Sequence, residues 1–300
     1  MADLWEPVNG VFTATAPLFS WVSSVPGAAA GEWGSALISA GLGAGVGAWM
    51  AGRIARSSKL RDELLAELRS IDVAITLCAS VIDVAGALKG QHVLALRSKY
   101  ESDLKRFAQH QAAGRAAGPF TLRINNFKLQ AIAPPISELQ GIVLNGMSIS
   151  PNGVRSVIAL ADAVENLNGM LESYNELLGV FRNGALPAGF MPEHYYLGLP
   201  VGGVVNNEYG STVQAIAIYT DDVIFFACKL AECLTSQGVK VSERYKKLSG
   251  EKRIIRRLSL LDGKAGLVPS DSGYEDWMRG WEEDLSDVAN KRWWWHGKQK

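Results

Sequence analysis

Residues 34–52 have the sequence GSALISAGLGAGVGAWMAG, a run of nineteen residues without a charged side chain. As an α-helix this run is about 28 Å long, close to the roughly 30 Å hydrocarbon core of a bilayer. The alternative is a buried helix of a soluble protein, but each glycine would destabilise a helix in water by up to about 1 kcal/mol. Membrane helices use glycine for close packing. The run therefore predicts a transmembrane helix.

The charges on either side of this run predict its orientation. Residues 1–33 contain Asp3, Glu6 and Glu32 but no Lys or Arg, so the basic start of a signal peptide is missing. The residues after the run are basic, at Arg53, Arg56, Lys59 and Arg61. Because basic flanks stay in the cytoplasm, we expect a single-pass protein of the inner (cytoplasmic) membrane. Residues 1–33 would form an extracytoplasmic N-terminal segment, and the C-terminus would lie in the cytoplasm.

Small residues recur at every fourth position of the run and predict self-association. One stripe is formed by Ser35, Ser39, Gly43 and Gly47. A second stripe is formed by Ala36, Ala40, Ala44 and Ala48. Small residues let membrane helices approach closely, and two packing faces suit a ring better than a dimer. We expect a homo-oligomer held by the first stripe; the alternative is that small residues reflect composition alone.

The remaining residues predict a mostly α fold. Apolar residues spaced three and four apart between Leu60 and Ile82 extend the membrane helix into the cytoplasm. A turn at Lys89–Gly90 and a second apolar helix face then predict an antiparallel helical hairpin over residues 53–118. Two alternating runs around Asn125–Asn126 predict a small β-hairpin within a connector, residues 119–150.

Residues 151–264 form a predicted helical domain that contains a Gly/Pro-rich loop, residues 183–211. Ser150 is a predicted N-cap, with Pro151 in the first turn. The helix that follows has a heptad seam of apolar residues: Val157, Leu160, Val164, Leu167, Leu171, Tyr174, Leu178 and Phe181. This seam can pack within one chain or between chains. A further helix is expected from Glu208 to Ser236.

Charge is balanced overall, with thirty Lys and Arg against thirty Asp and Glu, which excludes a wholly basic nucleic-acid binder. Locally, residues 238–264 hold nine basic and three acidic residues, and residues 271–290 hold seven acidic and one basic. Residues 265–300 form an acidic amphipathic tail through Trp277 and Trp281, ending in a Trp/basic cluster. This cluster suits membrane lipid or a protein partner.

The basic segment is the predicted binding site for a nucleotide or oligonucleotide. On a helix its cations form a band that can hold phosphates, and Tyr245 can stack on a base. The candidate ligand-binding residues are Lys240, Arg244, Lys247, Lys252, Arg253, Arg256 and Arg257. Three alternatives compete: a solvated helix face, pairing with the acidic segment, and attraction to anionic lipid.

No catalytic signature is present in the sequence. It lacks a phosphate-binding G-x-x-x-x-G-K-[ST] loop, a G-x-S-x-G elbow and an H-E-x-x-H zinc helix. Asp221 and Asp222 are adjacent, so their side chains diverge on a helix. Cys78, Cys228 and Cys233 are too few for a disulfide scaffold and have no histidine near them. We expect no catalytic residues, no metal, no cofactor and no enzymatic activity.

In organisation the chain resembles membrane effectors of bacterial anti-phage defence, including Hailong-type systems. The resemblance lies in an outward N-terminus, a single span such as Gly34 to Gly52 and a cytoplasmic ligand-sensing body. It implies an oligomeric pore or channel controlled by a nucleotide-derived signal. It covers the architecture of the whole chain without a matched motif, so it assigns no residue a role. The alternative is a membrane-tethered scaffold or assembly protein without a small ligand, and a tethered enzyme is a third class.

Overall fold

The computed structural model describes residues 5–8, 11–14, 32–114, 120–124, 127–258 and 266–279, with side chains from Trp49 onward within these ranges. The chain divides into two compact units, residues 1–60 and 61–300. In the first unit, β1 (Trp5–Val8) pairs antiparallel with β2 (Val11–Ala14). The long helix α2 (Glu32–Leu88) begins in the same unit.

The helix predicted from the uncharged run is present, because α2 includes residues 34–52 and continues far beyond them. The predicted oligomerisation residues, Ser35, Ser39, Gly43 and Gly47, lie on α2 but outside the residues whose side chains are described. Among the described residues, one helix, Trp49–Ala113, is long and apolar enough to cross a membrane, by length and composition only. Half of the most apolar stretch of this helix is buried inside the protein, as in the core helix of a soluble domain.

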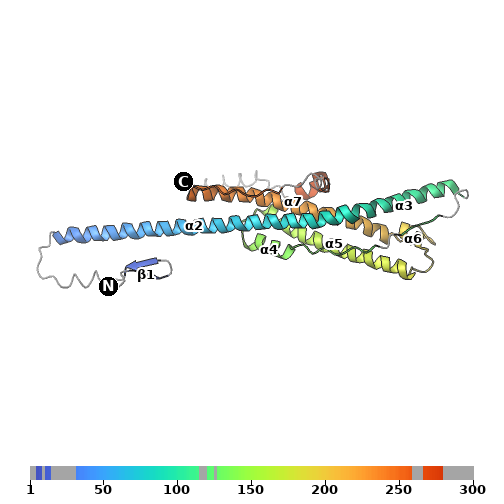
Figure 1. Ribbon diagram of the computed structural model, residues 1–300, viewed down its shortest axis with the longest axis horizontal. Coiled ribbons are helices and arrows are strands. Elements are labelled where there is room, and N and C mark those ends of the chain that lie inside the picture. Colours follow the sequence, from blue (N-terminus) through green and yellow to red (C-terminus); the bar gives the residue numbers. More distant parts are fainter. Residues whose placement is uncertain are drawn as a thin grey trace, which may run out of the picture. The chain divides into compact units, whose positions relative to one another are not determined.

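The predicted hairpin turn at Lys89–Gly90 is wrong. A π-helical turn, η1 (Lys89–Val93), joins α2 to α3 (Leu94–Ala113), and the backbone is right-handed helical on both sides of it. From residue 61 onward these elements run end to end (Figure 1). The turn is packed into the bundle, because the Lys89 ammonium lies 2.6 Å from both the Leu267 carbonyl oxygen and the Asp221 carboxylate.

The core of the second unit lies where α5 (Pro151–Asn183) and α7 (Glu208–Ser249) pack along each other. The predicted N-cap is confirmed, since the Ser150 side chain accepts a hydrogen bond from the Gly153 N–H. The heptad seam from Val157 to Leu178 is buried within the chain, which confirms intrachain packing. Helix α7 extends thirteen residues past the predicted end at Ser236 because its face continues to be buried as far as Tyr245.

The predicted loop 183–211 carries a short helix, α6 (Pro192–Leu197), that brings tyrosines into the bundle. Tyr196 packs against Tyr209 with ring centroids 4.4 Å apart. Burial, together with Glu208, raises the pKa of Tyr195 to about 12, so its hydroxyl stays protonated and donates to the Glu208 carboxylate at 2.6 Å. Gly210 makes room for the packed tyrosines, because a Cβ there would overlap the Tyr100 hydroxyl.

The β-hairpin predicted around Asn125–Asn126 is not found: residues 120–124 and 127–135 form no strand, and the two asparagines lie outside the described residues. The chain ahead of α4 (Ile136–Asn145) is instead held by two side chains of α5. The Leu129 N–H donates to Asn175 Oδ1 at 3.0 Å, and the Asn175 amide donates to the Leu129 carbonyl at 2.7 Å.

Asn168 makes the same pair of hydrogen bonds with the backbone of Ile132, both at 2.9 Å. The geometry fits because seven residues of helix and three residues of extended chain each span about 10 Å. The two asparagine amides therefore satisfy the backbone groups that a neighbouring strand would have paired.

We expect Asn168→Ala and Asn175→Ala each to lower the free energy of unfolding by about 1–3 kcal/mol, because each leaves a buried N–H and C=O unpaired. The double variant should lose less than the sum, since both side chains hold one segment. Thermal unfolding in detergent measures the effect. Asn166→Ala, at an exposed position of α5, is the matched control; equal melting of all three variants would contradict this role.

Candidate ligand pocket

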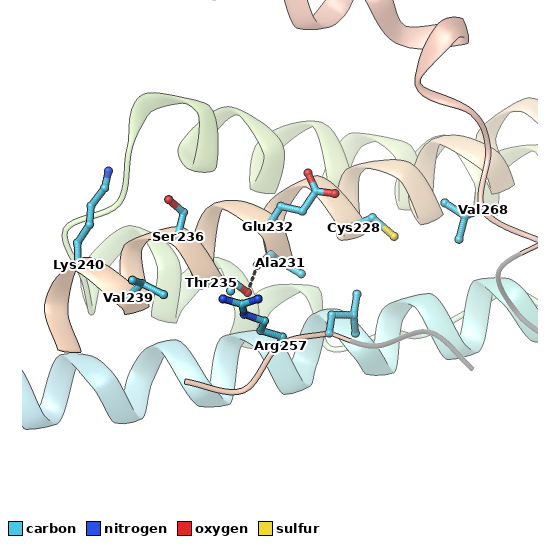
Figure 2. Close-up of a pocket in the computed structure, with 10 residues that line it drawn as sticks. Cys228, Ala231, Glu232, Thr235, Ser236, Val239, Lys240, Arg257 and Val268 are labelled. Atoms are coloured by element: carbon cyan, nitrogen blue, oxygen red, sulfur yellow. Dashed lines mark hydrogen bonds between the residues drawn. The ribbon is translucent and has the colours of Figure 1, made fainter. Parts of the chain in front are cut away.

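An open pocket of about 690 Å³ lies between α7 and the chain that follows it (Figure 2). One face of α7 forms the first wall, through Cys228, Ala231, Glu232, Thr235, Ser236, Val239 and Lys240. The other wall is formed by Arg257, Leu258 and Val268. The pocket is thus an apolar trough with charged groups along it.

The second wall belongs to residues 251–258, which we call the return segment. Helix α7 ends at Ser249, and the left-handed backbone of the next residue, Gly250 (φ 76°), reverses the chain. The Ser242 hydroxyl donates to the carbonyl of Arg253. The backbone N–H of Arg256 donates to the Asp72 carboxylate of α2 at 3.4 Å. These bonds hold the return segment against both helices.

Gly238 sets how closely these three segments approach. A Cβ at this position would lie 2.9 Å from Cγ2 of Ile255 and 3.2 Å from Cγ2 of Ile71. Ile255 belongs to the return segment and Ile71 to α2, so a glycine on α7 lets both side chains pack on its backbone. The position of the second wall therefore depends on residue 238 being a glycine, which has no side chain.

The pocket combines two cations, Lys240 and Arg257, which suit an anionic group, with acceptors that suit a donor of the same ligand. Figure 2 shows the Arg257 side chain reaching from the return segment toward α7, beside Thr235. The Thr235 hydroxyl donates to the Ala231 carbonyl at 2.7 Å, which leaves its lone pairs to accept (dashed line in Figure 2). Lys240 is exposed at one end of the α7 face, and Glu232 is an exposed carboxylate that pairs with Lys229 at 3.2 Å.

Cys228 lies at the apolar side of the pocket and is buried. Burial, reinforced by Glu232, raises the pKa of this thiol to about 11. At pH 7 the group is therefore a neutral thiol, whereas a nucleophilic cysteine has to be a thiolate. The residue acts as part of the apolar wall.

The predicted helical band of cations is wrong, because the return segment is not helical after Gly250. Of the seven candidate residues, Lys240 and Arg257 meet at the pocket. Arg244 and Lys247 are exposed on α7 beyond it, and Lys252, Arg253 and Arg256 are exposed on the return segment. Tyr245, expected to stack on a base, is only 4% exposed and belongs to the core.

The acidic tail packs on its own chain as far as it is described. Asp271 pairs with Lys229 at 3.0 Å rather than with the basic segment. Tyr274 stacks on Phe225, with ring centroids 3.6 Å apart. The Arg155 guanidinium lies 3.9 Å above the Trp277 ring. Trp281 and the terminal Trp/basic cluster lie outside the described residues.

Asp221 and Asp222 bind different partners, which confirms that they do not form a carboxylate pair. Asp221 pairs with Lys89, while Asp222 accepts a hydrogen bond from the Tyr274 hydroxyl at 2.8 Å. Burial raises the pKa of Asp222. Both carboxylates therefore serve to attach neighbouring segments to α7.

The α7 wall of the pocket was not predicted from the sequence, although the spacing of small residues on this helix indicates a close contact. Ala231, Thr235, Gly238 and Ser242 place small residues three and four apart on one side of the helix. Such spacing indicates that another segment approaches the helix backbone closely. It does not reveal which segment approaches.

Comparisons with protein-family models, with curated proteins and with solved structures found no match. Within the described ranges, no group of three or more His, Cys, Asp or Glu side chains is placed to hold a metal ion. Functional inference therefore depends on the residues of this chain.

We expect Gly238→Val to displace the return segment, because its side chain would overlap Ile255 and Ile71, at a cost of about 1–3 kcal/mol in the free energy of unfolding. Trypsin should then cut faster after Arg253 and Arg256. Thermal unfolding and mass spectrometry of the digest measure both effects. Gly169→Val is the control, since a Cβ there meets nothing within 4 Å; equal cleavage in both variants would contradict the packing argument.

Proposed function

We propose that the protein is a single-pass protein of the inner membrane, with residues 34–52 across the bilayer and the helical bundle in the cytoplasm. The support is the uncharged run on α2 together with the basic residues that follow it. Positive charge on one flank favours retention of that flank in the cytoplasm. The orientation therefore follows from the residues on each side of the run.

We expect a C-terminal fusion to green fluorescent protein to fluoresce and the same fusion to periplasmic alkaline phosphatase to be inactive. A phosphatase placed ahead of residue 1 should be active if the N-terminus is outside. The protein should also stay with membranes in alkaline carbonate. Release by carbonate, or an active C-terminal phosphatase, would overturn the proposal.

We further propose that the protein is an oligomeric effector that controls membrane permeability in anti-phage defence, in response to a nucleotide or oligonucleotide. The observation that carries this is the pocket, where Lys240 and Arg257 adjoin apolar walls. A ligand's base can lie on Val239 and Leu258 while its phosphates meet the cations. Self-association would use the stripe that includes Gly43 and Gly47.

The return segment gives such a ligand a way to act on α2. It forms one wall of the pocket and also bonds to Asp72 of α2, the helix that includes the proposed span. A ligand shifts a two-state assembly only by its difference in affinity for the two states. A ligand that moves Arg257 would supply this difference.

We expect full-length protein in zwitterionic nanodiscs to bind fluorescent ATP or a labelled oligoadenylate, measured by anisotropy. Lys240→Glu with Arg257→Glu should lower affinity at least tenfold, because two attractive charges become repulsive. Binding should weaken as salt is raised. Arg97→Glu with Lys105→Glu, two charge reversals at exposed positions of α3, is the control with an equal charge change.

A second candidate function, a membrane-tethered scaffold, is favoured by an apolar groove of about 680 Å³. It is lined by Ile149, Val154, Ile158 and Trp277, among others. Dye leakage from vesicles separates the two functions: an effector releases dye when the nucleotide is added, whereas a scaffold does not. Binding without leakage in wild type would contradict control of permeability.

A further inference from the structure

One end of the bundle gathers basic side chains around exposed apolar ones. We call this surface the basic tip and define it by Lys246, Lys247, Leu248, Lys252, Arg253 and Ile254. All six are exposed, and Ile254 is 87% exposed although it is apolar. The neighbouring Ile255, in contrast, packs toward Gly238. The surface therefore combines exposed apolar side chains with exposed cations that are close to them in the sequence.

The contacts between α2 and α7 place the end of α7, with Leu248, at the start of the second unit, and Arg253 lies one to two helical turns back, beside Ser242. Lys89 pairs with Asp221, while Ile71 lies against Gly238, so the two helices run antiparallel. The number of residues between these two contacts is nearly the same on both helices, so the helices stay in register. Ser249, eleven residues beyond Gly238, is therefore level with the residues near Arg61. Figure 1 shows α7 ending toward this end of the unit.

This end of the unit is also where the chain arrives from the proposed membrane span. Arg61 follows Gly52 by nine residues. Nine residues reach at most about 32 Å when fully extended and about 14 Å as a helix. The chain therefore tethers this end of the unit to the cytoplasmic end of the proposed span, and this step depends on the proposed span.

The composition of the basic tip fits an anionic bilayer surface. Cations near such a surface are attracted to lipid phosphates, and a flanked apolar side chain can enter the boundary between headgroups and acyl chains. The acidic residues nearby are Glu243 and Glu251, together with Asp62 and Glu63 at the same level on α2. Lys252 pairs with Glu243 at 3.6 Å, and both side chains are well exposed, so this pair is easily exchanged for lipid.

We propose that the basic tip docks on anionic phospholipid of the inner leaflet, with Ile254 and Leu248 inserted at the headgroup boundary. The basic residues predicted for a nucleotide thus divide into two groups. Lys240 and Arg257 belong to the pocket, and Lys247, Lys252 and Arg253 belong to the lipid surface.

The test uses full-length Ile254→Cys protein carrying an environment-sensitive fluorophore. The protein is reconstituted in vesicles of phosphatidylcholine alone or with phosphatidylglycerol added, and lipids with a spin-labelled acyl chain serve as quenchers. We expect a blue shift and quenching only with phosphatidylglycerol. Adding Lys247→Glu and Arg253→Glu should abolish both.

Two controls accompany this measurement. Ile218→Cys, at a 57% exposed position of α7 near the other end of the bundle, should show no quenching in either vesicle. Wild-type protein measures background labelling, which should be low because burial raises the pKa of all three native thiols, that of Cys78 to about 12 and that of Cys228 to about 11; the half-buried Cys233 sets the background.

Carbonate extraction of the same vesicles separates this proposal from the proposed span. Protein that stays integrated while the label at position 254 remains unquenched overturns the basic tip but leaves the span standing. Protein that is extracted by carbonate although the label had been quenched overturns the span alone. A label that responds to a labelled oligonucleotide and not to phosphatidylglycerol makes the surface a nucleic-acid site, which also overturns the proposal.

Discussion

The close approach of three segments at Gly238 is the constraint on which the arrangement of the bundle depends. Because α7 has no side chain there, Ile71 of α2 and Ile255 of the return segment both reach its backbone. The return segment then runs alongside α7 and closes one wall of the pocket. The same contact fixes the register of α7 against α2, and so determines which residues form the end of the bundle.

Features encoded by neighbouring residues could be predicted from the sequence, whereas those that depend on distant partners could not. The Ser150 cap and the seam of α5 follow from local spacing and were correct. The prediction of a turn at Lys89–Gly90 was wrong because the Lys89 side chain bonds to Asp221 and Leu267, which are far along the chain.

The same distinction explains the other differences. The β-hairpin failed because the extended chain found its hydrogen-bond partners in two asparagine side chains of α5. The site was half predicted: Lys240 and Arg257 were among the candidates, but their apolar surroundings require knowing that the chain reverses at Gly250. The spacing of the cations in the sequence does not predict that the chain reverses there.

The π-helical turn limits which insertions and deletions the continuous helix formed by α2, η1 and α3 can accept. Buried residues step by three or four along α2 to Leu88, then by five to Val93, and again by three or four to Leu96 and Tyr100. One residue of an α-helix corresponds to about 100° of rotation. An insertion or deletion between Leu88 and Val93 would therefore turn α3 away from the bundle, whereas the same change in an exposed loop would be absorbed. A change in the length of this continuous helix at η1 thus also changes which face of α3 points toward the bundle.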